Sequence, residues 1–466
     1  MGGRSPAERE RAGRDARSQV PPEGHGALGT AGRPDPVRVL LDQDSSRVPE
    51  LVPIRHARMA ESPFAFFRGS AAVMAGDLAG TPRSGFDVQL AGDAHLANFG
   101  TFGSPERTLV FDLNDFDETA RGPWEWDLKR LAASLVVAGR ANGFTEKQNR
   151  KLAVTAARRY RDAMTSFAGM GNLAVWYARM DVEGVRQQLG DELDPRLRKR
   201  LDRSVDKART RDHLRSLDKL TEVHDGERRI LADPPLLVPV SHLAGDASRE
   251  EIESGVHDIL RDYVASLRSD LRELVGSYDF VDMARKVVGV GSVGTRCWVV
   301  LLRGRDDDDP LFLQVKEAQA SVLSRHLGPG AYDNQGERVV AGQRIMQAAS
   351  DVFLGWHRTT GLDGTARDFY VRQLHDWKGS PDVESLTPKG LRLYARLCAW
   401  TLARAHARSG DRIAIAAYLG DDDRLPQAVA DFATTYADLT EQDHAAFAAA
   451  VADGQPARAA DDRTRR

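Results

Sequence analysis

The chain has 466 residues, with 65 lysine and arginine residues against 68 aspartate and glutamate residues, which gives a formal net charge of −3. This balance argues against a general nucleic-acid-binding protein, which usually displays a basic excess, so we expect no nucleic-acid partner. The two cysteines cannot build a disulfide framework. The apolar runs fall well short of the roughly 18–20 residues of a membrane helix, and the N-terminus lacks an apolar signal-peptide core. We therefore expect a cytoplasmic protein with no membrane partner.

The length exceeds what one hydrophobic core usually holds, so two lobes are expected. Both ends lack apolar periodicity and are charged or rich in glycine and proline, which is typical of disorder. The expected organisation, in chain order, is a disordered tail over 1–36, a mainly helical lobe over 37–284, a β-rich lobe over 285–378, C-terminal helices packing on the first lobe over 379–453, and a disordered tail over 454–466.

Apolar residues recur at helical spacing in several stretches of the first lobe. From Phe64 to Leu78 they predict one helix, and over 127–170 they predict two helices separated at Gly143. The stretch 190–225 is predicted to be a charged helix pair. Its basic residues alternate with acidic ones, which favours a solvated helix face over an anion site.

The stretch 92–100, Gly-Asp-Ala-His-Leu-Ala-Asn-Phe-Gly, follows a predicted strand over 86–90 and so places Asp93 on a loop at a strand end. A second short strand over 109–111 then brings Asp112 back beside this loop. We expect the two carboxylates to lie close together.

An aspartate, an asparagine five positions later and a second aspartate after an apolar strand form the spacing by which kinase-type enzymes place a base and two metal ligands around a phosphate. Phosphoryl transfer needs an oxygen base near the acceptor hydroxyl and oxygen ligands for Mg²⁺. Asp93, Asn98 and Asp112 would supply these groups.

Other interpretations of this stretch stay open. Asp93 or Asp115 could merely hydrogen-bond their own backbone in an Asp-rich turn. His95 could be a structural loop histidine, or it could hold a phosphate or a metal. An EF-hand loop is excluded, because the run beginning at Asp112 has neither the required glycine nor the bidentate glutamate.

At these residues the chain resembles the aminoglycoside phosphotransferase and choline kinase branch of the protein-kinase-like superfamily, whose catalytic loop has the form Gly-Asp-x-His-x-x-Asn. The resemblance implies that Asp93 is the catalytic base and that His95 is the catalytic-loop residue on the phosphate side. It also implies that Asn98 and Asp112 are metal ligands.

The resemblance continues over 122–128, Gly-Pro-Trp-Glu-Trp-Asp-Leu, which is similar to the segment that opens a buried helix in that branch. It implies that Asp127 braces the catalytic loop, and Asp115 would support the metal loop. More closely, residues 50–440 resemble a family of bacterial proteins, domain of unknown function 2252.

The elements that would bind the nucleotide are not found before Asp93 and are predicted in the β-rich lobe. A Gly-x-Gly-x-x-Gly run is followed by an apolar strand over 297–302, whereas a Rossmann site would need a helix there, so the run is typical of a kinase phosphate flap. A glycine-rich hairpin turn is the alternative. The residues expected to hold the nucleotide phosphates are Gly289, Gly291, Ser292 and Gly294.

The next strand, over 311–318, is similar to the kinase strand whose lysine pairs the α- and β-phosphates, and Lys316 is the corresponding residue. A helix over 337–347 could supply the carboxylate partner of this lysine. Glu337 is the candidate, with Glu317 and Gln343 as alternatives. Further on, 369–374 is predicted to be a strand leading into a hinge, and 391–408 an amphipathic helix beneath the site.

These patterns predict an α+β, two-lobed, protein-kinase-like fold that is circularly permuted, with the catalytic loop first and the nucleotide flap second. The expected cofactors are ATP and Mg²⁺, and the expected activity is phosphoryl transfer to an unidentified small molecule. The alternatives are a catalytically silent nucleotide-binding scaffold, a nucleotidyl transferase, and a hydrolase in which Asp93, His95, Asp112 and Asp115 ligate metals directly.

Overall fold

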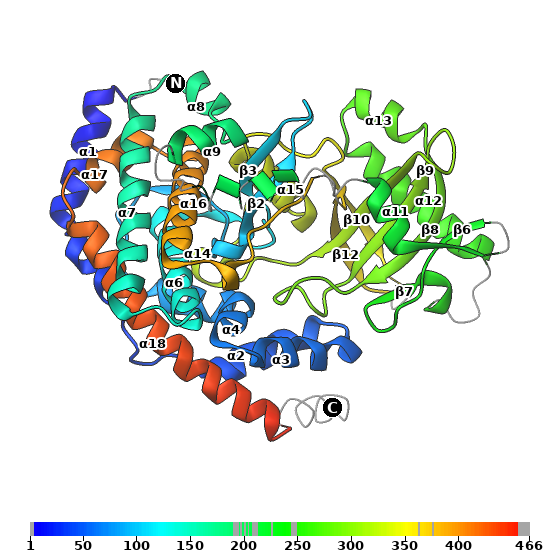
Figure 1. Ribbon diagram of the computed structural model, residues 1–466, viewed down its shortest axis with the longest axis horizontal. Coiled ribbons are helices and arrows are strands. Elements are labelled where there is room, and N and C mark those ends of the chain that lie inside the picture. Colours follow the sequence, from blue (N-terminus) through cyan, green and yellow to red (C-terminus); the bar gives the residue numbers. More distant parts are fainter. Residues whose placement is uncertain are drawn as a thin grey trace.

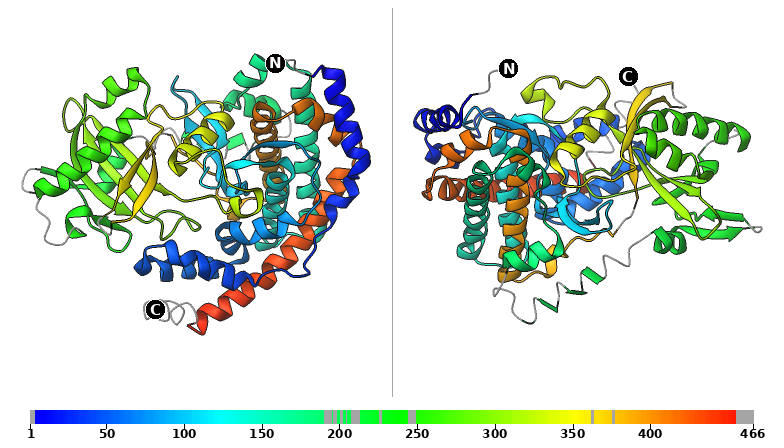
Figure 2. Two further views of the ribbon diagram at one scale, coloured as in Figure 1. Left: turned by 180° about the vertical axis from the view of Figure 1, so that it is seen from behind. Right: turned by 90° about the horizontal axis from the view of Figure 1, so that it is seen from above.

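The computed structural model describes residues 4–189, 213–224, 227–243, 249–361, 364–374 and 377–454, together with a few residues between 195 and 206. Helices gather in one half of the molecule, and the largest sheet forms the other half (Figures 1 and 2). The chain is therefore of the α+β class, as predicted. In the described part of the chain, none of the helices combines the length and the apolar character needed to cross a membrane.

The sheet half is built on six antiparallel strands in the order β11-β12-β10-β9-β8-β7. Their bounds are β7 (Leu237–Pro239), β8 (Asp279–Lys286), β9 (Cys297–Arg303), β10 (Pro310–Ala318), β11 (Gly355–Thr360) and β12 (Ala366–Gln373). The strands predicted over 297–302, 311–318 and 369–374 are thus confirmed. The acidic run over 306–309 lies in the turn between β9 and β10.

Both faces of this sheet are covered, which explains why β10 is buried along its whole length. Leu311, Leu313 and Val315 pack in a cluster with side chains of α12 (Arg249–Ala265) and α13 (Ser269–Val275). Phe312 belongs to a second cluster, with Leu217 of α11 (His213–Leu220). Because side chains alternate along a strand, Lys316 points to the same face as Phe312.

The helical half has a core of long helices, in which α16 packs on α7, and α18 packs on both α6 and α7. Their bounds are α6 (Trp124–Ala141), α7 (Glu146–Ala168), α16 (Pro388–Ser409), α17 (Arg412–Leu419) and α18 (Arg424–Ala452). The break between α6 and α7 contains Gly143 at φ +74°, as predicted. The amphipathic helix predicted over 391–408 is α16.

Two short antiparallel pairs lie at the inner edge of the helical half. They are β1 (Asp87–Leu90) with β4 (Ala120–Pro123), and β2 (Phe99–Gly103) with β3 (Leu109–Leu113). The helix predicted from Phe64 to Leu78 is instead two helices, α4 (Pro63–Gly69) and α5 (Ala71–Ala79). Ser70 separates them because its backbone leaves the helical region, at φ −110° and ψ 33°.

The prediction of disorder over 1–36 is wrong for the residues described there. Helix α1 (Pro6–Gln19) begins with a capping box and lies along α17 (Figure 1). Two of its arginines are docking groups. Arg9 pairs with Asp411 at 2.8 Å, and Arg17 pairs with Asp422 at 2.8 Å.

The remaining described helices are short or peripheral. They are α2 (Pro36–Gln43), α3 (Val52–Ala60), α8 (Asn172–Tyr177), α9 (Val182–Leu189), α14 (Ser324–Leu327) and α15 (Gln335–Met346). The helix pair predicted over 190–225 lies largely outside the described residues; the described end of that stretch is α11 followed by β5 (Thr221–His224), which pairs with β6 (Glu227–Ile230). All but the first residue of the tail predicted over 454–466 lies outside them too.

Arg33 ties the N-terminal segment to the helical half, and its replacement should destabilise the protein. Its guanidinium contacts Asp77 and Asp443, each at 2.6 Å, with only 11% of the arginine side chain exposed. Because Arg33→Met leaves two buried carboxylates without their cation, the free energy of unfolding should fall by about 3–5 kcal/mol in denaturant titrations. Arg14→Met, which removes an arginine that is 62% exposed, should change it little. Equal stability of the two variants would contradict the docking role of Arg33.

Candidate functional site between the two halves

A tight turn at the end of β1 carries Asp93. Gly92 adopts φ +81°, and a Cβ atom there would lie 2.1 Å from the carbonyl oxygen of Glu118, so the turn requires glycine. The carboxylate of Asp127, at the start of α6, accepts hydrogen bonds from the backbone N–H groups of Ala91 at 2.7 Å and Gly92 at 3.0 Å. These bonds fix the path of the chain into Asp93.

Asp93 itself is held by one guanidinium. Arg130 donates from Nε to Asp93 Oδ1 at 2.8 Å and from Nη2 to the carbonyl oxygen of Phe67 at 2.7 Å. The second carboxylate oxygen lies 3.6 Å from Nε2 of His95. Burial lowers the pKa of His95 to about 4, so the imidazole is neutral at pH 7.

Asn98 lies directly behind Asp93. Its side-chain nitrogen donates to the backbone oxygen of Asp93 at 2.8 Å, which turns the amide oxygen away from that carbonyl. Its own backbone oxygen accepts from the N–H of Asn114 at 2.9 Å, so the loop is also tied to the segment that follows β3.

The structure does not support Asp112 as a metal ligand, and this assignment is corrected. Asp112 lies inside β3 with a side chain that is 2% exposed, and it accepts from Nη2 of Arg404 at 2.6 Å and from the N–H of Ala348 at 2.9 Å. The strand continues for two residues beyond the prediction, to Leu113. The first carboxylates to leave it are those of Asp115 and Asp117.

Lys316 meets these two carboxylates. Its amine donates to Oδ2 of Asp117 and lies 4.0 Å from Oδ2 of Asp115, and the hydroxyl of Tyr370 donates to Oδ1 of Asp117 at 2.8 Å. Burial opposes the charge of Lys316, yet Asp115 and Asp117 hold its pKa well above the ordinary value. Burial and the neighbouring Asp117 raise the pKa of Asp115. Burial also acts to raise the pKa of Asp117, but the contact with Lys316 lowers it overall.

Glu337 does not pair with Lys316 in the described structure, so this assignment is also corrected. It stands in the first turn of α15, where its N–H is capped by Asn334. The alternatives are engaged elsewhere, since Glu317 binds Arg296 and Gln343 donates to Gln347. The partner of the lysine therefore comes from the loop after β3 and not from the helix.

The glycine-rich run forms the loop between β8 and β9, as a flap or a hairpin would. Gly289 and Gly294 adopt φ +67° and +91°, and the hydroxyl of Ser292 donates to Oδ2 of Asp117 at 3.4 Å. The N-terminal segment holds this loop from outside. Arg58 donates to the carbonyl oxygen of Gly289 at 2.6 Å, and the N–H of Val48 donates to the carbonyl oxygen of Gly294 at 2.8 Å.

These groups surround a cavity of about 150 Å³ between the two halves. Predicted residues that line it are Asp93, His95, Asn98, Asp115, Gly289, Gly291 and Ser292. Asp127 and Lys316 act at its edge through the bonds described above, whereas Asp112 and Glu337 do not line it.

Several lining residues were missed by the sequence prediction. Asp117 and Glu118 belong to the same acidic run as Asp112. Had the end of β3 been placed at Leu113, the carboxylates that follow it would have been selected as cavity residues. Burial raises the pKa of Glu118 to about 7. Arg47 and Arg68 also line the cavity, and no sequence pattern pointed to them.

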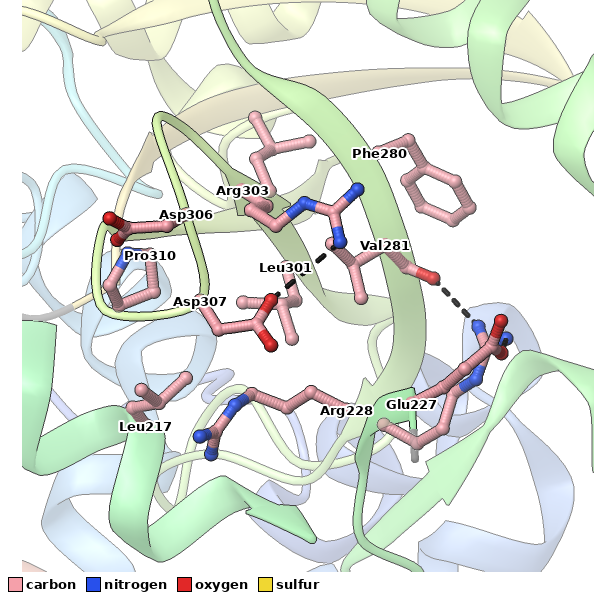
Figure 3. Close-up of a pocket in the computed structure, with 12 residues that line it drawn as sticks. Leu217, Glu227, Arg228, Phe280, Val281, Leu301, Arg303, Asp306, Asp307 and Pro310 are labelled. Carbon is pink, nitrogen blue, oxygen red and sulfur yellow. Dashed lines mark hydrogen bonds and ion pairs between the residues drawn. The ribbon is translucent and has the colours of Figure 1, made fainter. Parts of the chain in front are cut away.

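Two other cavities differ in character. One of about 170 Å³ lies beside β8 and β9. Its acidic side chains come from β6 (Glu227) and from the β9–β10 turn (Asp306 and Asp307), where Asp307 pairs with Arg303 at 3.6 Å (Figure 3). A larger one, of about 470 Å³, includes Arg372 and Lys378. None of the residues predicted as base, metal ligand or phosphate contact lines either one, and Gln343, an alternative partner for Lys316, lines the larger.

Among the described residues, no three His, Cys, Asp or Glu side chains stand together as a ready-made metal site. This is compatible with Mg²⁺, which commonly binds through one or two carboxylates plus substrate phosphates and water. Asp115 and Asp117, with the amide of Asn98 on the same cavity, offer the oxygen ligands that this ion takes.

The fold and the site define an α+β protein with a polar cavity between a helical half and an antiparallel sheet. A family described as an uncharacterized protein conserved in bacteria, DUF2252, matches residues 47–450. The chain belongs to this family, in agreement with the resemblance over 50–440. No curated protein and no solved structure matches the chain.

If Asp112 is a core residue and not a ligand, its substitution should act on stability. Because Asp112→Asn leaves Arg404, which is 1% exposed, without its counter-ion, the free energy of unfolding should drop by about 3–5 kcal/mol. Asp115→Asn relieves a like-charge contact with Asp117 but also removes a charge that favours the buried Lys316 ammonium, so the two effects offset and stability should change by about 1 kcal/mol or less. Denaturant titration of both variants checks this, and a larger loss for Asp115→Asn would restore Asp112 as the ligand candidate.

Proposed function

We propose that the protein is an ATP- and Mg²⁺-dependent phosphotransferase with a circularly permuted, two-lobed, kinase-like fold. The observation that carries this proposal is the contact between Lys316 and Asp117, which are 199 positions apart and meet beside the glycine-rich loop. A lysine on a sheet strand, a glycine-rich turn and loop carboxylates are the groups that grip nucleotide phosphates and their metal ion.

Asp115, Asp117 and the side-chain oxygen of Asn98 are the groups that would hold Mg²⁺. When bound, the ion neutralises charge on the transferring phosphoryl group. Lys316 binds phosphate oxygens as a permanent cation, because its pKa stays far above neutrality. The N–H groups of the loop over 289–294 approach the phosphates without side chains in the way.

Asp93 would act on the acceptor. Its carboxylate is positioned by Arg130 and lines the cavity opposite the glycine-rich loop. In the reaction, the acceptor oxygen forms a bond to the γ-phosphorus while the bond to the β–γ bridging oxygen breaks, and the hydroxyl proton passes to Asp93. His95, neutral and buried, orients this carboxylate from its second oxygen.

The alternatives are weighed by the same residues. A hydrolase needs Asp93, His95, Asp112 and Asp115 around its metals, yet Asp112 faces Arg404 in the core. Nucleotidyl transfer would use the same cavity and differs only in which phosphorus reacts. A silent scaffold would need neither Asp93 nor the carboxylates that follow β3.

Nucleotide affinity tests the grip of Lys316. Lys316→Met removes a charge-assisted contact of about 1.5–3 kcal/mol, so ATP binding with Mg²⁺ should weaken roughly 10- to 100-fold in calorimetry. Asp115→Asn should lower the dependence of ATP binding on Mg²⁺. Arg38→Met, a matched loss of one exposed cation on α2, should leave both unchanged. ATP affinity that is the same with and without Mg²⁺ in the unaltered protein would contradict the proposal.

Transfer tests the role of Asp93. Cell extract incubated with the protein and γ-labelled ATP should yield a labelled small molecule, and Asp93→Asn should slow its formation by about 10²- to 10⁴-fold while ATP affinity stays nearly the same. A product that is labelled by α-labelled ATP and not by γ-labelled ATP would favour nucleotidyl transfer. Equal rates for both proteins would remove Asp93 from the mechanism.

A further inference from the structure

The arginines around the cavity fall into two groups. Arg130 and Arg296 have carboxylate partners, Asp93 at 2.7 Å and Glu317 at 3.3 Å. Arg47 and Arg68 line the cavity itself, and neither has a carboxylate within ion-pair distance among the described residues. In both, the Nε atom is buried and has no hydrogen-bond partner in the described part of the chain.

The two unpaired arginines serve different sides of the cavity. Arg47 donates from Nη1 to the carbonyl oxygen of Val293 at 2.5 Å, so its guanidinium is committed to the glycine-rich loop. Arg68 lies in the last turn of α4 and, like Asp93, lines the cavity. Burial lowers the pKa of Arg68, and the carboxylate of Asp93 opposes this effect more than any other charge does.

A guanidinium that is drawn out of water without a counter-ion lowers the stability of the protein that contains it. Asp93 does not fill this role, because its Oδ1 is bound by Arg130 and its Oδ2 faces His95. Arg68 therefore presents planar N–H donors to the cavity, in the form that matches a phosphate or a carboxylate.

We propose that Arg68 binds an anionic group, phosphate or carboxylate, on the acceptor molecule, so that the acceptor is a hydroxyl compound that already carries a negative charge. The identification of this ligand as the acceptor rests on the proposed phosphotransferase function. The nucleotide phosphates have their own partners in Lys316 and the glycine-rich loop, whereas Arg68 stands beside the base that receives the acceptor proton.

Inorganic phosphate and acetate are the probes, titrated into the full chain with Mg²⁺ and saturating AMPPNP, a non-hydrolysable ATP analogue that fills the γ-phosphate position. Binding is followed by ³¹P NMR for phosphate and by thermal shift for both anions. Phosphate or acetate should bind saturably, and Arg68→Met should weaken that binding at least about 10-fold. Preference for phosphate over acetate identifies a phosphorylated acceptor, and the reverse preference identifies a carboxylate.

Arg38→Met is the matched control, because it removes an exposed arginine remote from the cavity lining, and it should bind the anions like the unaltered protein. Arg68→Gln, which keeps a polar side chain, replaces Arg68→Met if the latter does not fold. Unchanged anion affinity in either Arg68 variant, or exclusion of both anions by AMPPNP, would overturn the proposal.

The two hypotheses fail separately. If the protein does not bind AMPPNP, the phosphotransferase proposal is lost, but the same titrations without nucleotide still decide whether Arg68 binds anions. If AMPPNP binds and Arg68→Met has no effect on either anion, only the anionic acceptor is lost.

Discussion

The burial of one ammonium group constrains the whole interface between the halves. Lys316 stands on β10 with a side chain that is 3% exposed, and a buried charge is tolerated only when it is paired. Its partner, Asp117, belongs to the other half and also binds Tyr370 of β12. Separation of sheet and helices would leave this amine without a counter-ion, so the cavity walls are fixed by electrostatics as well as by packing.

A second cation, Arg338, stabilises the loop that follows β3 through its backbone. Arg338, in the first turn of α15, donates to the backbone oxygens of Thr119 at 2.6 Å, Asp117 at 2.8 Å and Gln319 at 2.8 Å. Carbonyl groups that no regular strand satisfies are thus bonded by a residue from the sheet half. Glu337 was the predicted partner of Lys316, but its neighbour Arg338 is the residue that holds the acidic loop in place. Arg338 does so through backbone oxygens and does not contact Lys316.

The sequence predicted those parts of the fold that depend on local pattern. Similarity to a lysine-bearing kinase strand predicted β10, and helical spacing predicted α16 and the break at Gly143. The five-residue spacing of Asp93 and Asn98 predicted their neighbourhood, since a short loop constrains them. Lys316 and the glycine-rich loop lie near these residues only because of the tertiary fold, and a local sequence pattern cannot predict such a long-range contact.

The failures have physical causes. The ladder of β3 extends two residues further than predicted, to Leu113, so Asp112 lies inside the strand and its carboxylate faces Arg404 in the core. The order of elements suggested a helical partner for Lys316, but partner choice depends on three-dimensional proximity. The arginines of α1 looked solvated because their aspartates lie about 400 positions away.

The contact between Lys316 and Asp117 also governs how ligands would enter. An anion that reaches this amine exchanges with a carboxylate already in place, so its arrival is a substitution and its rate depends on how often the pair opens. In the closed pair the contact with Lys316 lowers the pKa of Asp117, so this carboxylate is ionised when the exchange begins. A divalent cation travelling with the anion would meet that freed carboxylate. The divalent cation and the anion would then enter together, and the net charge of the cavity would change only by the charge of their complex.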